Sequence, residues 1–181
     1  MTISLYDITI AVYIRGLKNL YACLEKSEKW CTTNSRPLTE LTEARLAPDM
    51  HPLHFQVRTC TNMARSGTLN SSWRYVPSTP RPGETTDTTY EELRERIRKT
   101  LEFLEGIKKE DVDGNEVEPR DIWTGGEEGN GMFFHFDTGM DFLNKFIIPN
   151  FWFHSTTTYN ICRMQGVDLG KADFLVGGTG R

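Results

Sequence analysis

The residues best suited to chemistry lie in the last long amphipathic segment, around the run Phe-Trp-Phe-His at 151–154. Helical spacing places Asn150, His154 and Thr157 on one stripe. A lone histidine between large aromatic side chains on a core-facing stripe is either a satisfied core residue or the centre of a site. An unperturbed imidazole titrates near a pKa of about 6.5, so His154 could give or take a proton near neutral pH.

Polar groups elsewhere in the chain could complete a site around His154. Asp7 occupies a seam position in the first predicted helix, where a carboxylate is costly unless it is paired or reaches water. Asp7 is therefore either at an exposed helix end or in a polar pocket, where it would orient His154 or act as a second catalytic base. Asn150 and Gln56 would supply neutral hydrogen bonds that grip a carbonyl or stabilise an enolate.

Aromatic residues at helical spacing could wall a ligand that is apolar or aromatic. The predicted substrate-binding residues are Asn150, Gln56, Tyr6, Tyr13, Trp152 and Thr157. Each has a structural alternative, because aromatic residues at this spacing commonly fill a core and buried Asn–His pairs commonly bridge helices. The sequence is compatible with a ligand-binding role and with a structural role for these residues.

Helical periodicity marks the elements that must position these residues. The predicted helices cover about 4–30, about 49–67, 88–104 and 138–165. Thr88 or Thr89 begins the third helix, since each has a glutamate three residues later in the capping-box position. Pro149 is expected to kink or restart the last helix, and Gly166 to end it.

A small β-hairpin is predicted from the β-leaning runs 117–123 and 132–136. The fold class is therefore mainly all-α, a four-helix bundle with a small hairpin before the last helix. Residues 1–176 are expected to form a single domain and 177–181 a loose tail.

Composition narrows the function classes. The net charge of -4 argues against a nucleic-acid partner, which usually needs a basic face. No segment approaches the ~20 apolar residues of a membrane span, and the N-terminus lacks the pattern of a secretory leader. The four cysteines show no C-x-x-C pairing and are expected to be reduced thiols. A cytoplasmic protein is therefore expected.

Four landmarks give a resemblance to a known family. They are Met-Thr-Ile-Ser-Leu-Tyr at 1–6, Arg-Leu-Ala-Pro-Asp-Met-His-Pro-Leu at 45–53, Pro-Asn-Phe-Trp-Phe-His at 149–154 and Gly-Val-Asp-Leu-Gly-Lys-Ala-Asp-Phe-Leu at 166–175. The chain resembles the domain of unknown function DUF1993, which is grouped with the DinB/YfiT-like helical bundles. The resemblance covers nearly the whole chain.

The superfamily implies a four-helix bundle that is often dimeric. Many members hold a divalent metal with one histidine from the second helix and two from the last, and thiol transferases and hydrolases occur among them. By this resemblance His154 takes the place of the second histidine of the last helix, and Asn150 that of the first. No other histidine takes the place of the one that is missing at Asn150. If a metal binds, His154 would hold it with Cys60 or His54, or with help from Asp7.

Three hypotheses follow. The leading one is a small-molecule enzyme without a cofactor, doing acid–base chemistry (isomerisation, cyclisation, dehydration or hydrolysis) with His154 and Asp7 as catalytic residues. The second is a non-catalytic protein that binds a small organic molecule. The third is a metal-dependent hydrolase or thiol transferase with an altered ligand set. A homodimer is expected only from the superfamily.

Overall fold

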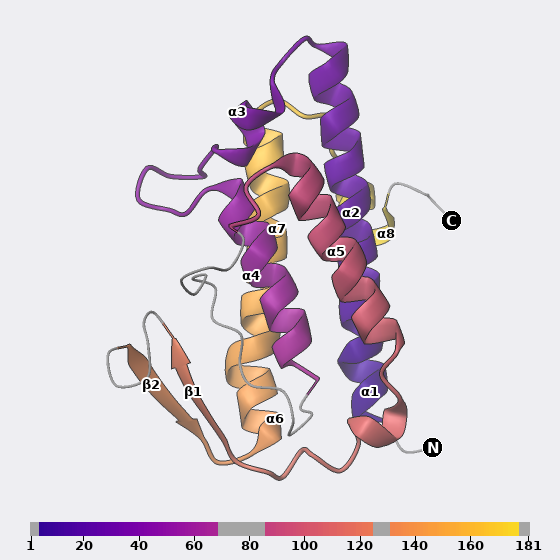
Figure 1. Ribbon diagram of the computed structural model, residues 1–181, viewed down its shortest axis with the longest axis vertical. Coiled ribbons are helices and arrows are strands. Elements are labelled where there is room, and N and C mark those ends of the chain that lie inside the picture. Colours follow the sequence, from indigo (N-terminus) through magenta and orange to yellow (C-terminus); the bar gives the residue numbers. More distant parts are fainter. Residues whose placement is uncertain (1–3, 69–85, 125–130, 178–181) are drawn as a thin grey trace.

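The long helices of the protein pack side by side in the computed structural model, which describes residues 4–68, 86–124 and 131–177 (Figure 1). They are α2 (Ile10–Thr33), α4 (Leu53–Ser66), α5 (Tyr90–Glu105) and α7 (Ile148–Met164). The short elements are α1 (Leu5–Ile8), α3 (Leu38–Thr42), α6 (Gly139–Phe142), α8 (Lys171–Val176), a 3-10 turn at Lys109–Asp111 and a π-helical turn at Leu143–Ile147. The predicted mainly helical fold with a hairpin before the last helix is confirmed.

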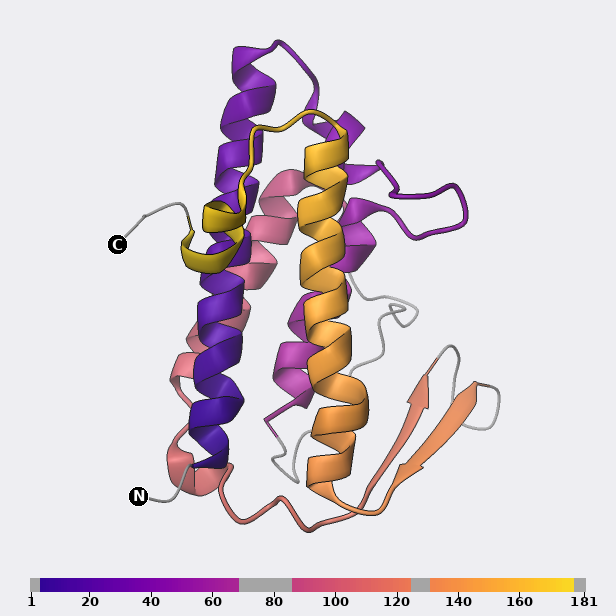
Figure 2. The same cartoon turned by 180° about the vertical axis from the view of Figure 1, so that it is seen from behind.

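The packing order of the helices places α4 between α5 and α7. α4 packs against both, α5 packs against α2, and α8 lies on α2. In Figure 1, α2 and α7 run upward while α4 and α5 run downward. Figure 2 shows α8 from behind, lying across α2 beside α7. The centre of the bundle is apolar, and its fully buried side chains include Ile10, Leu17, Leu24, Val57, Ile97, Leu104 and Phe151.

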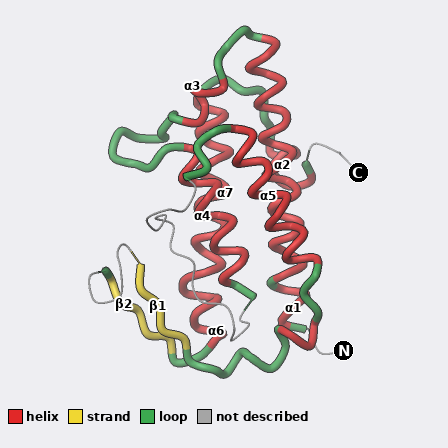
Figure 3. The backbone as a smooth tube through the Cα atoms, viewed as in Figure 1, coloured by secondary structure: helices red, strands yellow, loops and turns green. Residues whose placement is uncertain are grey.

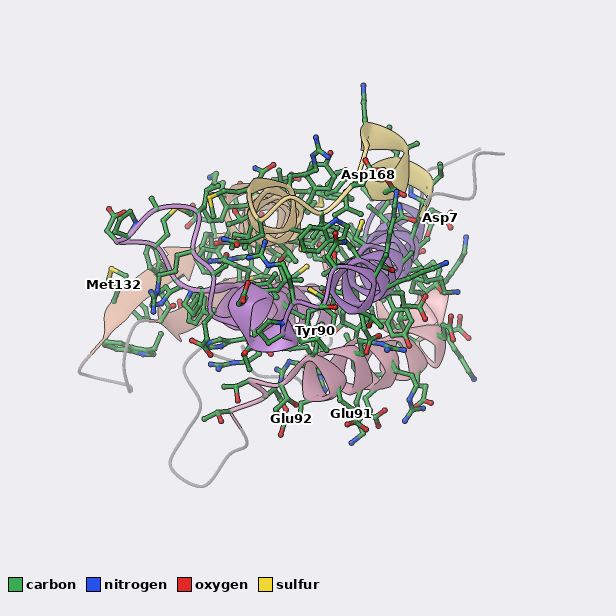
Figure 4. The ribbon with its side chains drawn as sticks, turned by 90° about the horizontal axis from the view of Figure 1, so that it is seen from above. Asp7, Tyr90, Glu91, Glu92, Met132 and Asp168 are labelled. Atoms are coloured by element: carbon green, nitrogen blue, oxygen red, sulfur yellow. The ribbon has the colours of Figure 1, made fainter. Side chains whose placement is uncertain are left out.

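The start of α5 confirms the predicted capping box. The Thr89 hydroxyl accepts the Glu92 backbone N–H at 3.3 Å, and the Glu92 carboxylate accepts the Thr89 backbone N–H at 2.9 Å. Two otherwise orphaned amides of the first turn are satisfied in this way. Glu91 and Glu92 point away from the bundle at this end of α5 (Figure 4).

Replacing Thr89 with Ala should remove the side-chain half of this cap. We expect a loss of about 1 kcal/mol in the free energy of unfolding, the usual cost of losing a threonine N-cap. Urea denaturation followed by circular dichroism measures it, with Thr89→Ser as the matched control that keeps the hydroxyl. An alanine variant as stable as the serine variant would contradict a role for the cap.

The first helix differs from the single continuous segment predicted over 4–30. Thr9, with φ −123° and ψ −80°, interrupts the helix and separates α1 from α2. Its hydroxyl donates to the Leu5 carbonyl at 2.7 Å, which satisfies an acceptor at the break. Periodicity continues through the break, so a sequence pattern cannot detect it. The break also removes Asp7 from the apolar seam on which it was placed.

The hairpin and the last helix follow the prediction closely. β1 (Arg120–Thr124) pairs antiparallel with β2 (Met132–Phe136), with Ile122 opposite Phe134. Both strands lie beside the bundle rather than inside it (Figure 3). Where Pro149 was expected to kink or restart the helix, a π-helical turn at Leu143–Ile147 leads into α7, and Pro149 sits in its first turn. The backbone is helical without a gap from Gly139 into α7, so Pro149 lies inside a helical run and the π-helical turn before it is the irregularity that accompanies the missing N–H.

The polar stretch 32–48, which lies between the first two predicted helices, contains the short helix α3. The segment 76–87, whose proline, glycine and threonine content is typical of a loop, lies mostly outside the described residues. Among the described helices, none has both the length and the apolar character needed to cross a membrane.

Candidate functional site

His154 lies in the middle of α7, against the first turn of α4. Its side chain is 9% exposed, and its Nδ1 is 2.7 Å from Oε1 of Gln56. Gln56 is itself 2% exposed, and its Nε2 donates to the His51 carbonyl at 2.8 Å. The two predicted residues therefore meet across the α4–α7 interface, held by a chain of hydrogen bonds that ends on backbone.

The hydrogen bonds of Gln56 fix the tautomer of His154. Because the amide nitrogen of Gln56 donates to the His51 carbonyl, the oxygen faces His154. An amide oxygen only accepts, so Nδ1 of His154 carries the proton and Nε2 keeps its lone pair. Nε2 has no hydrogen-bond partner among the described residues. Gln56 thus aligns the ring and leaves a hydrogen-bond acceptor on its other side.

Burial keeps His154 uncharged at neutral pH. Removal from water disfavours the imidazolium, and the neighbouring His51 adds to this, so the pKa of His154 falls from 6.5 to about 4. The hydrogen-bond partner is a neutral amide and offers no charge to offset the desolvation. At pH 7 the side chain is therefore a neutral imidazole.

Three rings surround His154 and form what we call the aromatic rim: His51, Phe55 and Phe153. The His51 ring stacks on Phe55 with centroids 3.8 Å apart, and Phe55 meets His154 edge-on at 6.2 Å. Phe153 lies edge-on to His154 at 5.2 Å and is 55% exposed. The stack needs the turn before α4 to bring His51 back over Phe55. The sequence offers only a weak signal for it, an imidazole and a benzyl ring four residues apart.

Asn150 and Thr157 share the stripe of His154, one turn away on either side. The Asn150 amide donates to the Phe146 carbonyl at 2.6 Å, and the Thr157 hydroxyl donates to the Phe153 carbonyl at 2.7 Å. Both bonds run to the carbonyl four residues earlier, so the polar groups of these side chains are satisfied within the last helical region. Their predicted contact with a ligand remains a prediction.

Asp7 does not lie in a pocket, and that part of the prediction is wrong. Its carboxylate is 51% exposed and forms an ion pair with Lys109 at 2.8 Å. Tyr6 lies in the same place, with the Lys109 ammonium 5.8 Å from its ring centre. Because the break at Thr9 puts both residues on the short helix α1, neither joins His154. Viewed from above, Asp7 and Met132 of the hairpin lie on opposite sides of the molecule (Figure 4).

Replacing Asp7 with Asn should leave both stability and ligand binding unchanged. An exposed ion pair in water contributes little, because solvent screens it and ordering two flexible side chains costs entropy. Thermal denaturation of the variant should give a melting temperature within experimental scatter of the wild type. A fall of several degrees, or lost binding in the screen described below, would show that Asp7 matters for the site after all.

Tyr13 and Trp152 also differ from their predicted place around a ligand. Tyr13 is fully buried, and its ring packs against Phe151 at 5.0 Å in the bundle core. Trp152 packs against Phe174 of α8 at 6.2 Å. Positions two apart in a helix face nearly opposite directions, so Trp152 cannot share a surface with His154. Both aromatic residues are parts of the packing.

The side chains proposed for an altered metal site do not gather around His154. Burial raises the pKa of the Cys60 thiol, which lies 3.7 Å from the Phe151 carbonyl. Nε2 of His54 lies 3.9 Å from Glu43. Within the described ranges, no group of three His, Cys, Asp or Glu side chains is arranged to hold a metal ion.

Comparison with known proteins identifies the family. The model of the domain of unknown function DUF1993 matches residues 5–175. The chain belongs to the DUF1993 family. A crystal structure of a DinB family member from Shewanella denitrificans is 34% identical, covers 94% of this chain and 91% of that one, and superposes with a TM-score of 0.75. None of the curated proteins matches the sequence. The DUF1993 fold is thus DinB-like.

The metal site typical of DinB-like proteins does not fit the residues of this DUF1993 chain. At and beside His154 the chain offers its imidazole, the amide of Gln56 bonded to that ring and, one turn earlier, the amide of Asn150. Gln56 uses its oxygen to accept from His154, and Asn150 uses its nitrogen on the Phe146 carbonyl. A tight zinc site needs three ligands drawn from His, Cys, Asp and Glu. We therefore derive no chemistry through a metal at this position.

Proposed function

We propose that this protein binds a small organic molecule at His154, with the neutral imidazole accepting a hydrogen bond from the ligand. The observation that carries the proposal is the pair of bonds made by Gln56, which commits Nδ1 as a donor and leaves Nε2 as an acceptor. Nε2 is not one of the fully buried polar atoms without a partner in the described residues, so it is open to solvent and within reach of a ligand. A ligand O–H or N–H would satisfy it.

The aromatic rim supports the same proposal. Phe153 is 55% exposed beside a nearly buried histidine, and a flat apolar ligand would remove that ring from water. Phe55 and His51 offer a second aromatic surface on another side of His154. The ligand we propose therefore combines an apolar or aromatic body with one hydrogen-bond donor.

Acid–base turnover of the bound molecule is the second candidate, and the fixed tautomer favours it. Nε2 is the nitrogen that would accept a proton, and Gln56 Oε1 would stay bonded to the opposite N–H throughout. A histidine whose pKa is about 4 accepts protons well only from acidic groups. No described carboxylate contacts His154 to act with it. We therefore propose ligand binding, and not catalysis, as the main function of the His154 site.

A fragment screen by ligand-observed NMR tests the proposal. We expect hits that bind the wild type, lose at least tenfold in affinity for His154→Gln, and bind His135→Gln normally. His135 is the matched control because it is an exposed histidine on the hairpin, 2.6 Å from Asp121. Hits that bind all three proteins equally would overturn the proposal. Incubating confirmed hits with the wild type and the glutamine variant, and following them by mass spectrometry, tests the second candidate.

A further inference from the structure

The charges around the start of α4 indicate which ligands suit the site. Burial is the main cause that lowers the pKa of His54, and the nearby Arg58, Arg45 and His51 lower it further. Glu43 is the carboxylate that acts on His54 in the opposite direction, and it is 63% exposed. The guanidinium of Arg58 also lies 5.8 Å from the centre of the Phe55 ring. This end of the α4–α7 pair therefore carries the guanidinium groups of Arg45 and Arg58 together with the carboxylates of Glu43 and Asp87, and it has no excess of negative charge.

The groups that face His154 itself are neutral or basic. From α4 come the amide of Gln56 and the ring of Phe55, and from the turn before α4 comes His51. On α7 the Thr158 hydroxyl donates to the His154 carbonyl at 2.9 Å, and Phe153 packs against the ring. None of these described groups carries a negative charge. Once a proton lies on Nε2, none of these groups would repel a negative charge placed beside it.

We infer that the ligand is a small aromatic acid whose carboxyl group meets Nε2 of His154 and whose ring packs in the aromatic rim. This inference rests on the proposed function and narrows its ligand class. When such an acid binds, one proton lies between the carboxylate and Nε2, giving a carboxylate–imidazolium pair. The proton comes from the carboxylic acid itself or, when the carboxylate binds, from the solvent, and no bond to carbon forms or breaks.

The pairing has a consequence that a neutral ligand would not share. Free His154 is unprotonated at pH 7, whereas the bound form needs the proton. Binding of a carboxylate must therefore take up close to one proton per site, and its affinity must fall by about tenfold for each pH unit between the pKa of free His154 and the pKa of the bound imidazolium. A neutral ligand that donates a hydrogen bond to Nε2 takes up none.

Isothermal titration calorimetry with benzoate and its neutral isostere benzamide tests this inference. Titrations at pH 6, 7 and 8, in pairs of buffers with different ionisation enthalpies, give the affinity and the number of protons taken up. We expect benzoate to bind at least tenfold more tightly than benzamide at pH 6, with proton uptake. His154→Gln should lose this binding, and the control His135→Gln should keep it.

If His154→Gln folds poorly, the inference can still be tested with a Phe153→Ala variant and with the histidine NMR signals of the wild type. Phe153 is exposed, so Phe153→Ala should fold normally and weaken benzoate severalfold. In the wild type, histidine ring NMR signals should show His154 becoming protonated when benzoate is added at pH 7. Failure of either result would count against the inference.

Different results would overturn different claims. Benzamide binding that depends on His154 and equals that of benzoate, without proton uptake, would overturn the acidic ligand class and leave the proposed function standing. If neither probe binds in a way that depends on His154, the inference fails. The fragment screen then decides the proposed function separately.

Discussion

Acidification from pH 7 to pH 4 should destabilise the wild-type protein by about 3 kcal/mol more than the His154→Gln variant. In the folded protein the pKa of His154 is lowered from 6.5 to about 4, chiefly by burial, whereas in the unfolded chain it returns to its ordinary value. Between these two values the unfolded state binds more protons than the folded state. Stability from the neutral histidine is therefore complete above about pH 6.5 and is lost as the pH falls toward 4.

Urea denaturation at half-unit pH intervals measures this difference. Carboxylates elsewhere also contribute to acid unfolding, but they are common to both proteins and cancel in the comparison. His135→Gln is an informative control, because Asp121 and Asp137 raise the pKa of His135. Removing that histidine should make the loss at low pH slightly steeper, the opposite of the effect at His154. Parallel curves for the wild type and His154→Gln would show that His154 is not buried as described.

Local chemistry explains which parts of the fold could be predicted from sequence. A capping box needs only Thr89 and Glu92 at fixed spacing, and a hairpin needs two β-leaning runs and a turn, so both signals are contained in short segments. The break at Thr9 has no such signal, since a β-branched residue is tolerated inside a helix. The alternative that placed Asp7 in a polar pocket fails for this reason, and the alternative of an exposed helix end holds.

The candidate site could be predicted only in part for a related reason. Helical spacing placed His154 on an inward stripe, and the α4 stripe placed Gln56 at a similar depth. The tautomer of the histidine depends on which end of the Gln56 amide faces it, and that is set by the carbonyl of His51. The orientation of the Gln56 amide therefore depends on the backbone of a turn, which a pattern of side chains in the sequence does not reveal. The stacking of His51 on Phe55 depends on the same turn.

Gly67 should prove one of the least replaceable residues of the helix pair that carries His154. A Cβ added at Gly67 would lie 2.7 Å from Tyr13 Cε2, 2.8 Å from Ile147 Cγ2 and 2.9 Å from the Tyr13 hydroxyl. Tyr13 is fully buried against Phe151, so its ring cannot move aside without disturbing the core. We expect Gly67→Ala to lose about 1–3 kcal/mol in the free energy of unfolding, the usual cost of overpacking.

Gly106→Ala is a matched control for this effect. Gly67 follows α4 with φ −74° and ψ 1°, and Gly106 follows α5 with φ −81° and ψ −11°, so the two backbones are nearly alike. A Cβ at Gly106 meets only ordinary contacts, 3.5 Å from the Phe103 carbonyl oxygen and 3.7 Å from that of Glu102. Alanine there should therefore stabilise the protein by about 0.4–1 kcal/mol, because it restricts the unfolded chain. Urea denaturation of both variants gives the two signs directly. Equal effects at the two glycines would mean that backbone conformation, rather than close packing against Tyr13, is why residue 67 is glycine.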